Sequence, residues 1–440
     1  MRWRLALGRQ TARWGLWGVL VLLSGCATYN ARFAPIDASL ARNDPAGALK
    51  LLEKQSFSER DRLLFHLDRA MLLRMLGQYA ESNRELEAAK GLIRTFDPFS
   101  VSEQTAAFFI NDATIAYSGV PLERVMVHVF AALNYLELGQ PDAARVEVLQ
   151  IDLLLRQLSE RAPEPALGVD PFARYLSGMI FEALGEDSDA LIAYRKALEA
   201  YRLQQPVTGL GVPNALQADL LRLTRRLGLA DEHDRLRALF PHADEPDPSP
   251  NQGRVILFVA NGLAPVKREV SDAVVDPTSG ILVRISLPVY EPRPSLVRRL
   301  RVRVGDVVYL AEPVENIAAI ARATLDAALP AITARAMARA VAKYQMAREA
   351  GKQDDLAGLL MNIVNVVTER ADTRSWLTLP GEIRMVRLSL PPGRHRLELE
   401  LLDDLGNLLG RHVWPDVTVH AGRIRFISYH YPVYRKKGHP

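Results

Sequence analysis

The residue types that most often carry enzyme chemistry are present in the chain, but they lack the spacings that this chemistry needs. The nine histidines include no His-Glu-x-x-His pair, which would place two zinc ligands on one helix face. We also find no Gly-x-Ser-x-Gly nucleophile elbow and no phosphate-binding glycine loop. His412, His420 and His430 could converge across neighbouring strands, although isolated histidines of a sheet are usually surface residues. The sequence therefore predicts no metal, no cofactor and no catalytic residue, and favours a protein that is not an enzyme.

The most unusual polar stretch runs from Ala371 to Trp376 and reads Ala-Asp-Thr-Arg-Ser-Trp. Asp372, Arg374 and Trp376 are candidate residues of a functional loop. In the alternative, structural interpretation, Asp372 turns the chain, Arg374 pairs with an acid and Trp376 anchors a sheet edge. An enzyme acting on envelope glycans remains the competing function, and Glu369 and Asp372 would be its first candidate acids.

The single cysteine, Cys26, follows a segment that is typical of a secretory signal. Four arginines precede a ten-residue apolar run, residues 14–23, which is about 15 Å long as a helix and too short to span a bilayer. The sequence Leu23-Ser24-Gly25-Cys26 resembles a bacterial lipobox, which implies that Cys26 is lipid-modified and becomes the first mature residue. Acyl chains at this position would anchor the protein stably in a membrane. Ala27, in place of the Asp that usually signals inner-membrane retention, predicts the periplasmic face of the outer membrane.

The charge of the chain is almost balanced once this leader is set aside. The chain has 440 residues, with 55 lysines and arginines and 51 acidic residues. Because residues 1–25 contain four arginines and no acid, 51 basic residues remain against 51 acidic ones. Nucleic-acid binding needs clustered positive charge, so we expect no nucleic-acid partner. The length predicts two or three hydrophobic cores.

From about residue 45 to residue 240 the apolar positions recur at helical spacing. Leu-Gly turns at Gly77, Gly139 and Gly185 each separate two predicted helices. The segment from Pro171 to Tyr201 resembles a tetratricopeptide repeat most closely, with small and aromatic residues at the expected places: Gly178, Phe181, Ala190, Tyr194 and Ala197. The sequence thus predicts a short array of degenerate repeats, with a generic helical bundle as the alternative.

The first helix of each such repeat lines a concave face. The repeat register places nine almost entirely apolar residues on this face: Leu64, Leu67, Met71, Met126, Val129, Leu133, Phe172, Tyr175 and Met179. A solvated groove of this kind would bind a partner helix or peptide, because soluble proteins rarely expose such a patch. In the alternative interpretation, which the sequence favours, the chain fills the groove with another of its own helices.

Beyond a linker with four prolines, residues 241–253, the pattern becomes strand-like. Strands are predicted at 255–259 and 281–289, in a hairpin that turns at Gly305-Asp306, and in four segments between residues 384 and 429. Together they make about seven strands, enough for a β-sandwich. An alanine-rich helix at 316–348, broken at Pro330, and a second helix at 354–370 interrupt the strands and are the first candidates for filling the groove.

The predicted fold class is therefore multidomain α + β, an all-α repeat array followed by a β-sandwich-like domain with a helical insertion. Its parts are the signal peptide (1–25), the repeat domain (26–240), the linker (241–253), a first β part (254–310), the helical insertion (311–370) and a second β part (371–434). The combination resembles a family of uncharacterised bacterial lipoproteins with degenerate tetratricopeptide-like helices, through Cys26, the repeats, residues 368–376 and Leu379-Pro380. This resemblance implies no activity. We expect an outer-membrane lipoprotein that binds an envelope protein through its helical repeats and contacts the membrane through its lipid.

Overall fold

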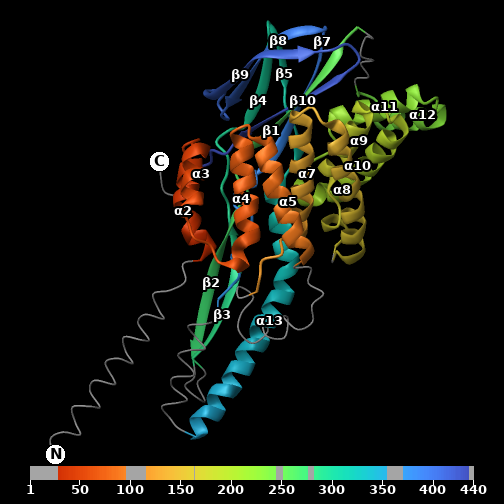
Figure 1. The fold of residues 1–440 in the computed structure, drawn as a ribbon. Coiled ribbons are helices and arrows are strands. Elements are labelled where there is room, and N and C mark those ends of the chain that lie inside the picture. The colour runs from red at the N-terminus through yellow and green to blue at the C-terminus, as the bar shows by residue number, and fades with distance from the viewer. Residues whose placement is uncertain are drawn as a thin grey trace, which may run out of the picture.

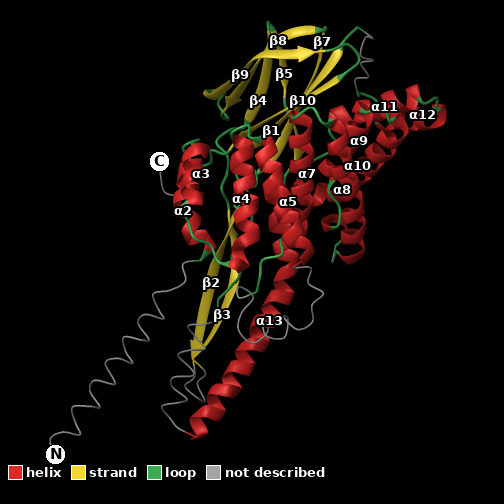
Figure 2. Ribbon diagram, in the orientation of Figure 1, coloured by secondary structure: helices red, strands yellow, loops and turns green. Residues whose placement is uncertain are grey.

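The computed structural model describes residues 28–95, 115–162, 164–243, 251–275, 282–353 and 370–435. The amino-terminal half of this described chain is helical and the carboxyl-terminal half is built mainly from strands, which confirms the predicted order of the two regions (Figure 2). The helices are α2 (Tyr29–Leu40), α3 (Pro45–Glu53), α4 (Arg62–Met75), α5 (Tyr79–Thr95), α7 (Pro121–Glu137), α8 (Pro141–Arg161), α9 (Pro171–Ala183), α10 (Asp187–Thr208), α11 (Asn214–Arg226) and α12 (Ala230–Leu239), with single 3₁₀ turns at Glu59–Asp61 and Pro165–Leu167.

The helices form consecutive antiparallel pairs. Gly77, Gly139 and Gly185 adopt positive φ angles of 74°, 69° and 80°, so each ends a helix in the left-handed conformation that glycine tolerates best. Gly228, with a φ of 70°, closes a further pair, α11 with α12, that the sequence pattern did not reveal. Successive pairs contact one another through α5 and α7, α8 and α9, and α10 and α11. The helical half is therefore a continuous stack of helix pairs.

Gly178 shows why small residues are needed within a pair. A Cβ atom at Gly178 would lie 2.3 Å from the ring of Tyr194 on the following helix. The bare backbone of α9 therefore lets α10 approach, and the buried Tyr194 ring fills the space beside it. This is the packing that the repeat pattern of this segment predicts.

The carboxyl-terminal half contains two four-stranded sheets. The inner sheet has the order β10-β1-β7-β6, and the outer sheet has the order β5-β4-β8-β9. Within the inner sheet β1 pairs parallel with β10 and antiparallel with β7. The strands are β1 (Gly253–Asn261), β4 (Arg299–Val304), β5 (Val307–Leu310), β6 (Glu312–Glu315), β7 (Glu382–Leu390), β8 (Gly393–Leu402), β9 (Leu408–Val419) and β10 (Ile424–Tyr431).

The inner sheet is the middle layer of the molecule. Alternate residues of its strands, among them Val255, Leu257 and Leu388, form one core with the outer sheet. The residues between them, among them Phe258 and Met385, belong to a second core that includes the helices. Because side chains alternate across a strand, a sheet covered on both faces reads as a continuous apolar run, as β1 does. The β half is thus a sandwich, and its inner sheet carries the helical stack.

Two further elements project from one end of this body (Figure 1). They are the hairpin of β2 (Val266–Val275) and β3 (Leu282–Glu291), and the helix α13 (Ile317–Gln353), which packs against β3. We call them together the projecting arm. The helix continues through Pro330 instead of breaking there, so the predicted break is wrong. A proline removes one helical hydrogen bond, and the long run of alanines on both sides sustains the helix.

Part of α13, Ile317–Ala342, is long and apolar enough to cross a membrane by length and composition, and 22% of this stretch is buried in the structure. The strand β2 was not expected, because its sequence intersperses charged residues with valines. The predicted helix at 354–370 and most of the predicted linker at 241–253 lie outside the described residues.

Candidate functional site

The nine predicted groove residues lie on α4, α7 and α9 and are all buried. Each has an exposed fraction of 3% or less, and all belong to the core shared by the helices and the inner sheet: Leu64, Leu67, Met71, Met126, Val129, Leu133, Phe172, Tyr175 and Met179. They are therefore not a free surface, and the prediction that they bind a partner is wrong for this folded state. The reason is that the chain covers the groove itself.

The groove is filled by the inner sheet and by the segment that leads into it. Phe258 on β1 contacts Phe172 edge to face, with ring centroids 5.7 Å apart, and stacks on Phe426 at 6.4 Å. Trp376, just before β7, packs edge to face on Phe130 of α7 at 6.0 Å. The expectation that the alanine-rich helix at 316–348 fills the groove is also corrected, whereas the second candidate, 354–370, lies almost entirely outside the described residues. The face of a sheet offers a broad apolar surface, which covers several helices at once.

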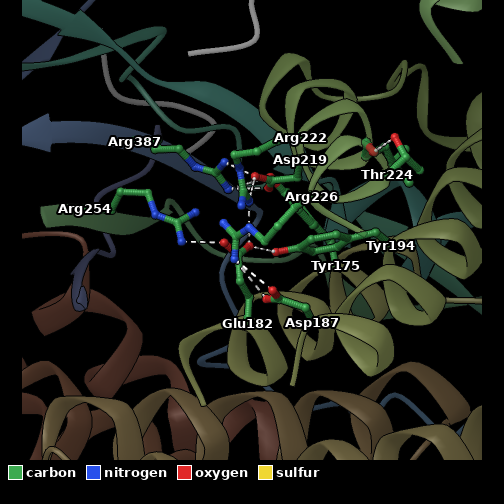
Figure 3. A network of polar contacts seen from close by, with 11 residues as sticks. Tyr175, Glu182, Asp187, Tyr194, Asp219, Arg222, Thr224, Arg226, Arg254 and Arg387 are labelled. Atoms are coloured by element: carbon green, nitrogen blue, oxygen red, sulfur yellow. Dashed lines mark hydrogen bonds and ion pairs between the residues drawn. The ribbon is translucent and has the colours of Figure 1, made fainter. Parts of the chain in front are cut away.

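A cluster of buried charges joins the α9–α11 end of the helical stack to the inner sheet (Figure 3). Asp219 on α11 is fully buried and accepts hydrogen bonds from Arg222, at 2.8 Å, and from Arg387 of β7, at 2.6 Å. Glu182 on α9 accepts from Arg222 at 2.7 Å and also pairs with Arg254 of β1. We call these five residues the charge cluster. Two acids and three arginines from both halves of the chain share it.

Two tyrosines complete the charge cluster. Tyr175 donates to Asp219 and Tyr194 donates to Glu182, both at 2.9 Å. Burial alone would raise the pKa of Asp219, but the charges of Arg387 and Arg222 outweigh it and hold this pKa well below its usual range. Asp219 is therefore ionised and fully paired. Because each carboxylate is already paired with arginines, the charge cluster is suited to holding the helices and the inner sheet together.

Two more buried acids fix the segment that precedes β7. Asp68 on α4 accepts from the Thr378 amide at 2.9 Å, from the Thr378 hydroxyl at 2.8 Å and from the Tyr29 hydroxyl at 2.5 Å. Glu123 on α7 accepts from the Trp376 amide at 2.7 Å. Burial raises the pKa of Asp68 to about 7 against the lowering effect of these hydrogen bonds. The sequence gives no direct sign of these contacts, because 310 and 253 residues separate the partners.

The candidate loop residues lie in this same segment. Asp372 pairs with the guanidinium of Arg374 at 2.9 Å, and Arg374 also donates to the Ile115 carbonyl at 2.9 Å. Arg374 and Trp376 are buried, and Trp376 packs into the helical stack rather than along a sheet edge. In the structure these residues attach the segment to the helices. Glu369 and the predicted lipid site Cys26 lie outside the described residues.

The described residues contain no group of three or more histidine, cysteine, aspartate or glutamate side chains that could hold a metal ion. The buried acids Asp219, Glu182, Asp68 and Glu123 accept hydrogen bonds from arginines, tyrosines or backbone amides. Glu315 differs, because it is buried and neither of its carboxylate oxygens has a hydrogen bond of normal geometry. The pairing of the other four acids stabilises a fold, whereas a general acid or base must reach a substrate. Structural attachment is therefore the chemistry that these contacts support.

No protein-family model matches the chain, and no curated protein matches it either. Among solved structures, the chain is similar to MamA AMB-1, with 14% identity over 49% of this chain and 90% of that one, at a TM-score of 0.30. MamA from Desulfovibrio magneticus RS-1 matches with 16% identity over 48% and 90%, also at 0.30. The Rap conjugation gene regulator of the plasmid pLS20, solved with the Phr* peptide, matches with 14% identity over 48% and 51%, again at 0.30. Likenesses at this level do not indicate a shared function.

Proposed function

We propose that the protein is a non-enzymatic lipoprotein, anchored through Cys26 to the periplasmic face of the outer membrane, that binds another protein of the cell envelope. The signal-like leader and the lipobox-like sequence ending at Cys26 support the anchor. The paired state of the buried carboxylates in the charge cluster supports a binding role over catalysis. Because the helical groove is occupied, the partner needs a different surface.

The projecting arm carries this proposal. Met337 and Val341 on α13 are 54% and 60% exposed, and Val270 on β2 is 54% exposed. A long helix with apolar residues on many sides is normally covered by other groups. Exposed apolar side chains on an element that projects from its own body are typical of a surface that associates with another molecule.

The partner on the arm is a protein rather than the interior of a bilayer. The hairpin beside α13 carries the acids Glu269, Asp272 and Glu291. Glu269 pairs with Arg284 at 3.0 Å, and Glu291 pairs with Arg268 at 2.7 Å. Charged groups are expensive in hydrocarbon, whereas protein interfaces accept them at a polar rim. The arm therefore carries exposed apolar side chains on α13 and paired charges on the hairpin that packs beside it.

This proposal is tested by photo-crosslinking in cells, with the crosslinker placed at position 337 or 341. We expect one discrete adduct, with the same distinct envelope protein, from both positions. The adduct from position 337 should be lost when Val341→Asp is introduced. The matched control is position 157 on α8, where Gln157 is also exposed and where we expect no such adduct. In parallel, Cys26→Ala should move the protein from the membrane fraction to the soluble periplasm.

Three results would contradict the proposal. An adduct containing only a second copy of this chain would make the arm a self-association surface. No adduct at either arm position would remove the arm as an interface. Continued firm membrane attachment of Cys26→Ala would refute the lipid anchor.

A further inference from the structure

A cavity of about 270 Å³ lies where the α4–α7 part of the helical stack meets the edge of the inner sheet. The end of α4, the start of α5 and α7 form one side, and strands β1, β7, β9 and β10 form the other. Its lining combines aromatic rings with a few polar groups, chiefly Arg74, Tyr79, Phe130, Trp414, Tyr429 and His430. We call it the junction cavity. A volume of this size is enough for one ring with small substituents, since a protein cavity of about 150 Å³ can hold benzene.

Arg74 supplies a buried positive charge on the helical side. Its side chain is 7% exposed and donates to the amide oxygen of Asn134 and, at 2.6 Å, to the hydroxyl of Ser428. Both of these partners are neutral. The nearest acid in this chain of contacts is Glu137, which accepts from the same Ser428 hydroxyl at 2.6 Å. A guanidinium has five N–H donors, so Arg74 retains donors for an anion in the cavity.

His430 supplies an unsatisfied polar group on the sheet side. It is 9% exposed, and neither ring nitrogen has a hydrogen bond of normal geometry to the described residues. Burial, assisted by the charge of Arg74, lowers the pKa of His430 to about 3, against a smaller raising effect of a weak hydrogen bond to the Gly262 backbone that lies outside normal geometry. The imidazole is therefore neutral at physiological pH, with one N–H to donate. Buried polar groups without partners are rare in native proteins and usually have a functional or solvent partner.

Aromatic rings form the wall beside these two groups. His412 packs on Trp414 and on Tyr429, each at a centroid distance of 4.4 Å, and Trp414 meets Tyr429 edge to face at 6.1 Å. Phe130 lies beneath the Arg74 guanidinium at 5.6 Å. Such rings favour another ring in stacked or edge-to-face contact. Arg74 and His430 mark the place where the polar end of that molecule would lie.

We propose that the junction cavity binds a small molecule with one aromatic ring and a carboxylate. The ring packs against the wall of Phe130, Trp414 and Tyr429, and the carboxylate accepts hydrogen bonds from Arg74 and His430. This ligand gives the imidazole N–H an acceptor of normal hydrogen-bond geometry, which the described residues do not provide. It also gives the buried guanidinium an anionic partner in direct contact, in addition to the charge of Glu137 beyond Ser428. The same chemistry occurs in a free aromatic acid and in the terminal Phe or Tyr residue of a peptide.

The test is isothermal titration of the full mature chain with two probes. Phenylacetate represents the free acid and N-acetylphenylalanine represents a peptide terminus. We expect at least one to bind with one-to-one stoichiometry, and the tighter probe identifies the source. Phenylethanol, which keeps the ring but lacks the carboxylate, should bind at least tenfold more weakly. The variant Arg74→Gln should lower affinity about tenfold or more, as loss of a charge-assisted hydrogen bond predicts.

Ala260→Leu is the second variant, because Ala260 lines the cavity and a larger side chain there occupies it without removing any hydrogen bond. It should abolish binding while the melting temperature stays equal or rises. His420→Gln is the control, since His420 is exposed at the turn before β10, and it should bind as the parent does. Failure of both acids to bind, equal binding of phenylethanol, or unchanged binding by Ala260→Leu would overturn the proposal. In the first case the cavity would hold water only.

Discussion

The two ends of the contact between the helical stack and the inner sheet are built differently. At the α9–α11 end, Asp219 and Glu182 each have two arginines within hydrogen-bonding distance. At the α4–α7 end, His430 has no partner of normal geometry among the described residues and lies beside a cavity. Both ends use the same face of the same sheet. At one end the buried acids are therefore fully paired with arginines, although Arg222, Arg254 and Arg387 each keep a buried nitrogen without a partner. The other end keeps a cavity beside an unpaired imidazole.

The largest effect that tests this contrast is expected from Arg387→Met. This variant leaves the fully buried Asp219 with Arg222 as its remaining cation, and breaking a buried pair typically costs about 3–5 kcal/mol of unfolding free energy. Denaturant unfolding of the mature chain measures it. The double variant Asp219→Leu/Arg387→Met, which removes both charges, should recover much of the loss. A loss below about 1 kcal/mol in the single variant would show that the charge cluster does not fix the two halves.

A smaller effect should appear in the pH dependence of stability. Because the folded pKa of His430 is about 3, below its ordinary value of 6.5, only the unfolded chain binds this proton between those values. Stability from His430 is therefore lost as pH falls from about 6.5 toward 3. For Asp219, whose folded pKa is depressed, the loss begins only as pH falls below about 4.

Comparing the parent with His430→Phe isolates the contribution of His430 to the pH dependence. Asp68, whose pKa is raised in the folded chain, acts in the opposite direction, but it is present in both chains and its effect cancels. Between pH 7.5 and pH 5 the parent should lose about 2 kcal/mol more than the variant, as measured by denaturant unfolding. Parallel pH profiles for the two chains would mean that His430 is not held neutral by its surroundings.

The smallest effects are expected from removing single polar groups at pH 7.5. Tyr194→Phe at the charge cluster deletes a hydrogen bond to Glu182 and should cost about 1 kcal/mol. His430→Phe at the junction cavity deletes no hydrogen bond of normal geometry and should change stability by less than about 0.5 kcal/mol or increase it. Thermal unfolding of the two variants measures the difference. Equal losses of stability in the two variants would contradict the proposed difference between the charge cluster and the junction cavity.

The sequence predicted local features well, because these depend on neighbouring residues. The glycine turns at Gly77, Gly139 and Gly185, and the close approach at Gly178, follow from backbone conformation and helix period. The hairpin at Gly305 follows from the alternation of polar and apolar residues in the preceding strand, together with a glycine that adopts a positive φ at the turn. By contrast, the break at Pro330 was predicted from one residue, whereas the alanine-rich surroundings decided the outcome.

What covers the groove could not be predicted in the same way. Periodicity identifies an apolar helix face, but it contains no information about which distant segment packs on it. The pairs Asp219–Arg387 and Asp68–Thr378 join residues 168 and 310 positions apart. Nothing near Arg387 in the sequence distinguishes it from the surface arginines of other strands. The junction cavity also depends on this long-range assembly, since its lining comes from both halves of the chain.

The parallel pairing of β1 with β10 has a consequence for how the protein must be made. β10 ends at Tyr431, and its Phe426 belongs to the layer that covers the helices. A nascent chain therefore completes its helical repeats long before the ribosome has supplied their cover. During that interval the apolar face of the helices stays exposed to solvent. Exposed apolar surface of this kind favours aggregation or chaperone binding. Cotranslational folding of the first half alone would give an aggregation-prone intermediate rather than a stable domain.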